Sequence, residues 1–266
     1  MEVLDYPFMR SALLMGLILG ILFPLMGVFV VTRGMSFFSD FIAHAAILGG
    51  ALAVIAGISP PLFLIPYSIV VGLSASMVWN SFPLSRDTVL GVFYGGAIAA
   101  GVILIAVKGL SQTYLMQFLL GDILLISPLD IWLSAGLLAV FLVFLKLNLR
   151  KIVKSSFLPE VSMAEGVSVR AYDYVLIGFI AAAIALSVKV VGVILANAMV
   201  VIPAAAAKTI SRNFRQFMFI APLVGILSFV SGTVASFYLN IPTGPAIVAA
   251  AFVCFLAALA IKGVSA

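Results

Sequence analysis

Long runs of apolar residues, separated by short connections, follow one another along almost the whole chain. The hydrocarbon core of a bilayer is about 30 Å thick, and a helix of roughly 20 residues crosses it. Because backbone polar groups in lipid must be satisfied internally, such runs form either helices or a closed barrel. Barrel strands alternate in polarity over about ten residues, whereas these runs are unbroken. The pattern predicts an all-α polytopic membrane protein.

The composition agrees with a protein that lies in a membrane. Hydrophobic residues make up 65% of the chain and charged residues 9%, whereas soluble domains carry about 25% charged residues. A water-soluble fold is therefore excluded. The net charge of +5 matters through its position relative to the membrane, and we expect no nucleic acid partner. Cys254 is the only cysteine, which excludes an intrachain disulfide.

The apolar runs are long enough for about nine membrane spans. We predict them at about residues 9–32, 36–57, 61–79, 88–107, 129–147, 172–188, 192–208, 216–238 and 244–262. The first run is too long for a secretory signal peptide and belongs to the fold. The shorter stretch 113–126 is predicted as a short helix at a membrane face. An eight-span alternative folds 192–208 back as a broken or re-entrant helix, interrupted at Gly192, Asn197 or Pro203.

Basic residues lie mostly on one side of these spans. With the N-terminus outside, 11 of the 14 Lys and Arg residues fall on the cytoplasmic side. The other three, Arg10, Lys108 and Lys189, fall outside. Because cytoplasmic connections carry the excess of Lys and Arg in membrane proteins, we predict an external N-terminus and a cytoplasmic C-terminus.

Sequence motifs of ATP-hydrolysing and proteolytic enzymes are missing. No GxxxxGK[ST] loop is present, so the chain lacks an ATP-binding loop of that type. His44 is the only histidine, which excludes a two-histidine metalloprotease site within one chain. Asp40 alone clearly lies within a span, whereas a membrane aspartyl protease needs two facing aspartates. Enzyme functions therefore have little support in the sequence, and we expect no enzyme.

An aspartate and a histidine lie within the second predicted span. Asp40 and His44 are four residues apart, which puts both side chains on one helical face, about 6 Å apart along the axis. Ionisable residues within a span are costly and indicate function by default. Carboxylate and imidazole suit a divalent transition metal ion, although the spacing also suits a hydrogen-bonded Asp–His pair. A two-fold dimer would supply four ligands instead of two.

Five short segments carry a family resemblance. They lie at residues 33–45, 87–91, 120–124 with 127–130, 200–207 and 242–245. The first contains Asp40, His44 and the following alanine, as in a Gly-Asp-x-x-x-His-Ala core, with Ser39 in place of the glycine and Phe41 where a small residue is common. In this order the segments resemble the membrane permease of bacterial ABC importers for zinc, manganese or iron, over about residues 8–262.

The resemblance implies an ABC importer permease bundle, one transmembrane domain over residues 1–266, in the lipid bilayer of the bacterial cell (inner) membrane. It implies that Asp40 and His44 bind the transported divalent zinc, manganese or iron ion, with no permanently bound cofactor. It also implies a homodimer, a separate cytoplasmic ATP-binding cassette ATPase, and an extracytoplasmic metal-binding protein that delivers the ion.

The one long cytoplasmic connection contains a segment, 157–167, that can form a short helix. Pro159 lies at its start and Gly166 at its end, as is typical of helix termini. The resemblance implies that this segment is the coupling helix that docks in a groove of the ATPase. The residues implied in coupling are Pro159, Glu160, Ala164, Glu165 and Gly166. An ordinary capped linker would have the same features.

Several residues and functions keep two interpretations. Asn197 and Met199 either line the pathway or pack between helices, and packing is the commoner role. Gly192, Gly225 and Gly232 are predicted to allow close helix approach. An ABC permease for a metal chelate, such as a siderophore or cobalamin, is one alternative function. A proton-coupled secondary transporter, with the Asp–His pair as proton relay, is another, although no internal repeat is visible.

Overall fold

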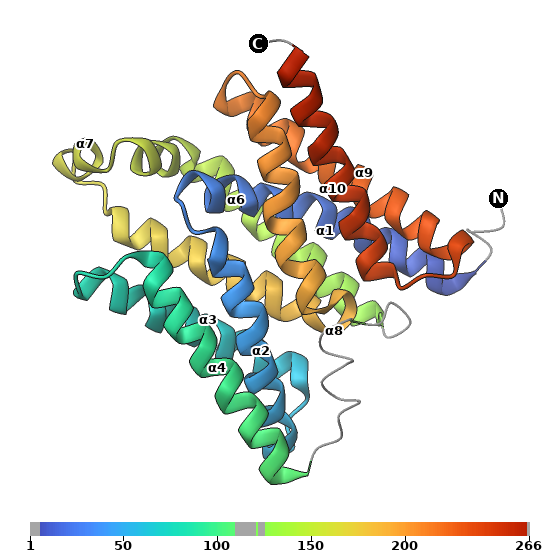
Figure 1. The fold of residues 1–266 in the computed structure, drawn as a ribbon. Coiled ribbons are helices and arrows are strands. Elements are labelled where there is room, and N and C mark those ends of the chain that lie inside the picture. Colours follow the sequence, from blue (N-terminus) through green and yellow to red (C-terminus); the bar gives the residue numbers. More distant parts are fainter. Residues whose placement is uncertain (1–5, 110–120, 122–125, 265–266) are drawn as a thin grey trace.

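The computed structural model describes residues 6–109, 121 and 126–264. Within them it contains helices and no strand, which confirms the predicted all-α class. The helices, shown in Figure 1, are α1 (Pro7–Thr32), α2 (Ser36–Ala56), α3 (Pro60–Ser81), α4 (Arg86–Lys108), α6 (Pro128–Phe157), α7 (Pro159–Ala164), α8 (Val169–Ile210), α9 (Phe214–Leu239) and α10 (Thr243–Val264). Apart from Gly121 and Ile126, the short helix predicted at 113–126 lies outside the described residues.

Nine helical segments in the described part of the chain are long and apolar enough to cross a membrane, as predicted. Two of them, Val169–Val188 and Val191–Ile210, are the halves of α8. The halves run in different directions (Figure 1), because Gly192 between them has φ 80° and ψ 161° and interrupts the helix. The second half is long enough to span on its own, which favours nine spans over the eight-span alternative.

Gly192 is the position in α8 where we expect a side chain to be most costly. Its combination of φ and ψ is open almost only to glycine, so Gly192→Ala should destabilise the protein by about 1–3 kcal/mol. The measurement is the midpoint of thermal unfolding in detergent. Gly178→Ala is the control, because a Cβ there meets nothing within 4 Å; it should leave the midpoint unchanged or raise it. An unchanged midpoint for Gly192→Ala would contradict a fixed kink.

Observed helix boundaries agree with the predicted ones within three residues, except at the end of α6. This helix continues to Phe157, whereas the sequence placed its end at 147. The prediction was wrong because it took Lys146 and the basic residues after it as the start of a loop. Charges end the part of a helix that lipid surrounds, but Lys and Arg are good helix formers. The helix stops at Leu158, whose helical conformation is disfavoured by the following Pro159.

The interrupted helix α8 lies at the centre of the bundle. It packs against α1, α2, α3, α6, α9 and α10. Two of the predicted close approaches are confirmed in the neighbouring helices. A Cβ at Gly225 of α9 would lie 2.3 Å from the carbonyl oxygen of Gly20 in α1. A Cβ at Gly232 would lie 2.4 Å from the Cα of Ile247 in α10. These glycines let α9 approach both neighbours backbone to backbone.

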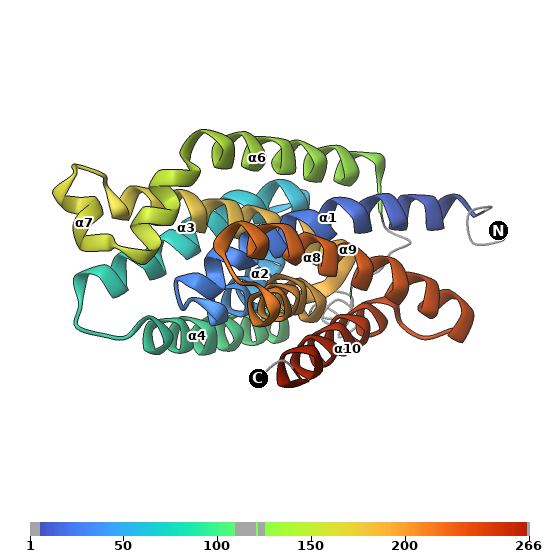
Figure 2. The same ribbon diagram turned by 90° about the horizontal axis from the view of Figure 1, so that it is seen from above.

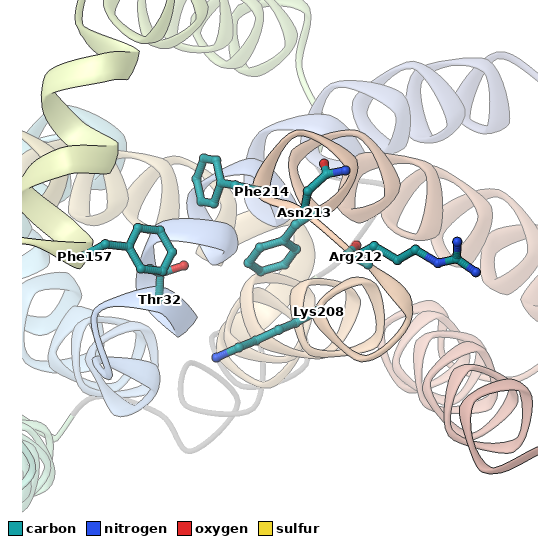
Figure 3. Close-up of a pocket in the computed structure, with 8 residues that line it drawn as sticks. Thr32, Phe157, Lys208, Arg212, Asn213 and Phe214 are labelled. Carbon is teal, nitrogen blue, oxygen red and sulfur yellow. The ribbon is translucent and has the colours of Figure 1, made fainter. Parts of the chain in front are cut away.

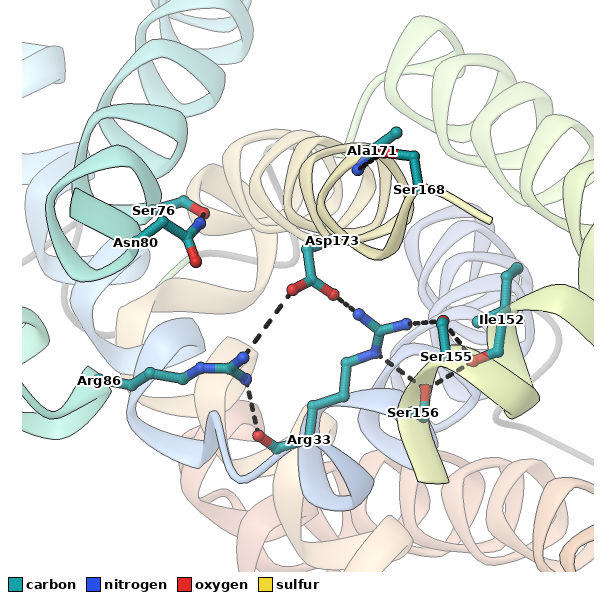
Figure 4. A network of polar contacts seen from close by, with 10 residues as sticks. All are labelled: Arg33, Ser76, Asn80, Arg86, Ile152, Ser155, Ser156, Ser168, Ala171 and Asp173. Carbon is teal, nitrogen blue, oxygen red and sulfur yellow. Dashed lines mark hydrogen bonds and ion pairs between the residues drawn. The ribbon is translucent and has the colours of Figure 1, made fainter. Parts of the chain in front are cut away.

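One end of the bundle holds a buried network of charges (Figure 4). Arg33, between α1 and α2, forms an ion pair with Asp173 of α8, and the two side chains are 4% and 7% exposed. Arg33 also donates hydrogen bonds of 3.0 Å to Ser155 and Ser156 of α6. Arg86 of α4 lies 3.9 Å from Asp173 and donates to the backbone oxygen of Arg33 at 3.0 Å. The network joins the ends of α4, α6 and α8 to the connection between α1 and α2.

This charged end also carries α7. Burial, and to a smaller extent the neighbouring Arg86, lowers the pKa of Arg33 to about 10, so its guanidinium is still charged at neutral pH. Ser155 and Ser156 precede α7 closely in the chain. Figures 1 and 2 place α7 at the opposite end of the bundle from the start of α1. A displacement of α7 would therefore act directly on the helices that the network joins.

Candidate functional site

Asp40 and His44 share one face of α2, as their spacing predicts. Their side chains are 29% and 18% exposed, whereas Phe41, Ile42 and Ala43 between them are buried in the core. The apolar residues thus fix the orientation of α2, because turning them toward lipid or water would lose their packing. The consequence is a polar pair held at the edge of the core.

The two side chains are arranged so that each keeps a free ligand atom. His44 Nδ1 lies 2.9 Å from the backbone oxygen of Asp40 and 3.4 Å from its Oδ1. Because a carbonyl oxygen only accepts hydrogen bonds, Nδ1 carries the proton, and in the neutral imidazole Nε2 keeps a lone pair. Metal-binding histidines usually donate their other ring N–H to a carbonyl or carboxylate in this way. Nε2 and Asp40 Oδ2 are therefore the atoms suited to bind an ion.

A pocket of about 420 Å³ lies beside this pair, between α2 and α4. It is lined by Phe37, Asp40, Asp87, Leu90, Gly91 and Tyr94. The Tyr94 ring lies against the His44 ring, with centroids 4.8 Å apart. Sequence reasoning missed Asp87 and Tyr94 as site residues. One sequence pattern could have identified them: Asp87, Gly91 and Tyr94 follow the spacing i, i+4, i+7, which puts them on one helical face.

Asn197 reaches the pair from α8. Its Nδ2 donates a hydrogen bond of 3.2 Å to Asp40 Oδ1. Its own Oδ1 is buried and has no hydrogen-bond partner among the described residues. Met199, two residues further along, lies fully buried in the apolar core. The structure thus brings Asn197 to the candidate site and places Met199 among packing residues.

The segment predicted to couple to an ATPase forms a six-residue helix, α7, with Pro159 in its first turn. The helix ends at Ala164, with Glu165 as its C-cap residue, and Gly166 follows with φ 76°. Glu165 forms an ion pair with Lys154 of α6, which ties α7 to the helix before it. Val161 and Met163 are 44% and 59% exposed. The helix thus presents two partly exposed apolar side chains.

A second pocket, of about 190 Å³, lies near α7. It is lined by Thr32, Phe157, Lys208, Ser211, Arg212, Asn213, Phe214 and Phe217. Figure 3 shows the Lys208 and Arg212 side chains extending in different directions. The two cations do not converge on one point, so we assign no ligand site here.

The donor set limits what one chain can bind alone. No cluster of three or more His, Cys, Asp or Glu side chains suited to a metal ion occurs in the described parts of the chain. The Asp40–His44 pair offers one oxygen and one nitrogen ligand, and Asn197 adds an amide beside them. Such a pair can bind an ion transiently, and a tighter site needs ligands from elsewhere.

In a comparison with known protein families, residues 5–262 match the family described as the ABC 3 transport family. The manganese import system permease protein ScaB of Streptococcus parasanguinis is 31% identical, over 95% of this chain and 90% of its own length. The high-affinity zinc uptake system membrane protein ZnuB of Haemophilus influenzae is 29% identical, over 93% and 95%. A solved structure of PsaBC from Streptococcus pneumoniae in complex with Fab matches with TM-score 0.85 and 28% identity, over 97% and 94%.

Proposed function

This chain belongs to the ABC 3 transport family, and from that premise we propose that it is the membrane permease of an ATP-driven importer of a divalent transition metal ion. The observation that carries the proposal is the Asp40–His44 pair, with Nδ1 of His44 occupied and Nε2 free. A hydrogen-bonded pair kept only for packing would not need a pocket beside it. Manganese and zinc appear in the names of its relatives.

The chemistry of the pair suits zinc, manganese or iron. Imidazole is a good ligand for zinc and iron, and carboxylate suits manganese. A transport site must bind its ion well enough to admit it and weakly enough to release it. One neutral imidazole and one carboxylate from each protomer meet both requirements.

We propose that two copies of the chain form the pathway. Each copy brings one Asp40 and one His44, so a two-fold axis near α2 provides four ligands. The site lies beside α4, which is among the least buried spans of the single chain. A helix with a largely uncovered surface next to the ligands suits contact with a second copy.

The energy source in this proposal is a separate ATP-binding cassette ATPase that docks on α7. The exposed side chains of Val161 and Met163 offer it an apolar contact, and the Lys154–Glu165 pair holds α7 to α6. The buried network around Arg33 then passes a displacement of α7 to α2 and α8. We place α7 and the C-terminus in the cytoplasm, where most basic residues fall. The N-terminus then faces the external metal-binding protein.

Uptake of metal ions by reconstituted vesicles tests this function. The vesicles contain the chain with its ATPase and metal-binding protein, and uptake of zinc, manganese, iron and cobalt ions is followed with and without ATP. We expect accumulation of zinc, manganese or iron that requires ATP. No accumulation of any ion by the assembled complex would overturn the proposal, and uptake that needs a proton gradient instead of ATP would favour a secondary transporter.

A further inference from the structure

Asn197 is the polar residue of the site that the proposed function does not yet use. It lies in the second half of α8, five residues after the kink at Gly192, in an otherwise apolar stretch. Its Nδ2 contacts Asp40 Oδ1 at 3.2 Å, and His44 Nδ1 lies 3.4 Å from the same oxygen. Oδ1 of Asp40 therefore accepts a hydrogen bond from Asn197 and has His44 Nδ1 close by, whereas Oδ2 has no hydrogen bond from a described residue and is left for a ligand.

The orientation of the Asn197 amide follows from the charge of its partner. An ionised carboxylate only accepts hydrogen bonds, so the NH₂ group must face Asp40 and the amide oxygen must face away. That oxygen is buried and finds no partner in the described part of the structure. Leaving a buried acceptor unpaired costs about 1–3 kcal/mol. Leucine, of similar shape, would avoid this cost, so packing alone does not account for asparagine here.

We propose that Asn197 is a positioning residue that makes Asp40 a one-oxygen ligand and so disfavours calcium. This inference rests on the proposed function. Ca²⁺ takes six to eight oxygen ligands and often binds both oxygens of a carboxylate. Transition metal ions such as zinc and iron also bind an imidazole nitrogen well. With Oδ1 held by Asn197, the site presents Oδ2 and His44 Nε2, a pair that suits a transition metal ion better than calcium.

The test uses the assembled complex in vesicles, with Mn²⁺ as the transported probe and Ca²⁺ as competitor. Asn197→Leu and Asn197→Ala both remove the donor, and Met199→Leu is the matched control from the same helix turn. Partners that orient a ligand are worth about 10–100-fold in metal affinity. We expect the KM for Mn²⁺ to rise by about 10–100-fold in both Asn197 variants. We also expect Ca²⁺ to inhibit them at a lower concentration than wild type.

The thermal unfolding midpoint and the split between KM and maximal uptake rate separate positioning from a structural role. A positioning role raises KM and leaves the midpoint near wild type for Asn197→Leu, whereas loss of a structural contact lowers the midpoint and the maximal rate. If the wild-type complex transports Mn²⁺ and both Asn197 variants show an unchanged KM and unchanged inhibition by Ca²⁺, the inference is overturned. Absence of uptake by the wild-type complex would instead overturn the proposed function, so the two failures are distinguishable.

Discussion

His44→Ala is expected to lower ATP-driven metal uptake about 100-fold or more while the protein remains folded. Losing a group that merely orients a metal ligand costs about 10–100-fold, and losing the ligand itself costs no less. His44 is the only histidine of the chain, so a dimer loses every permease imidazole at once. The imidazole lies at the edge of the core, against the Tyr94 ring. The measurement is the initial rate of uptake in vesicles.

Two further variants make this prediction specific. Asp40→Asn keeps the shape of the side chain and removes its charge, so we expect a similar loss of uptake. Ser74→Ala in α3 is the control, because the Ser74 hydroxyl donates to the backbone oxygen of Val71 in its own helix; uptake should stay at the wild-type rate. Near-normal uptake by His44→Ala would place the ion site elsewhere in the chain.

Asp173→Asn is expected to have the largest effect on stability. It removes the charge that balances Arg33, whose side chain is only 4% exposed. Breaking a buried ion pair by removing one partner costs about 3–5 kcal/mol, because the other charge stays buried and unpaired. The neighbouring Arg86 adds repulsion once the carboxylate is gone. The measurement is the free energy of unfolding in detergent, obtained from a denaturant titration.

An exposed ion pair in the same region supplies the comparison. Lys154 and Glu165 also form a pair, but their side chains are 35% and 54% exposed. Exposed pairs contribute only about 0.2–1 kcal/mol, so Glu165→Gln should change the free energy of unfolding by no more than that. Equal effects of Asp173→Asn and Glu165→Gln would contradict the buried character of the Arg33 network.

The membrane spans could be predicted from the sequence because bilayer thickness fixes a length that apolar runs must match. The same rule failed at α6, where Lys146 to Phe157 continue the helix beyond its apolar part. It could not choose between Gly192, Asn197 and Pro203 as the break in α8, because only the backbone geometry identifies Gly192. Close approaches at Gly225 and Gly232 were predictable, since small residues are what packed spans need.

Half of the candidate site could be predicted, for a physical reason. Asp40 and His44 are joined by local helical spacing, which a sequence displays directly. Asn197 is 157 residues from Asp40, and only the packing of α8 on α2 brings them together. Arg33 and Asp173 are also far apart in sequence, and the sequence showed Arg33 as a basic residue that sets orientation and as the first residue of the segment 33–45. Contacts between residues on different helices follow no regular spacing in the sequence, so they could not be predicted from it.

The most direct test of the central claim asks whether His44 touches the transported ion. The permease is labelled with ¹⁵N-histidine, assembled with unlabelled partners and loaded with Mn²⁺, and electron–nuclear double resonance is recorded. Because the chain has one histidine, a ¹⁵N coupling can arise only from His44. We predict coupling to two equivalent ¹⁵N nuclei, one from each protomer, which disappears in His44→Ala. Mn²⁺ held within the transporting complex without any ¹⁵N coupling would contradict the claim.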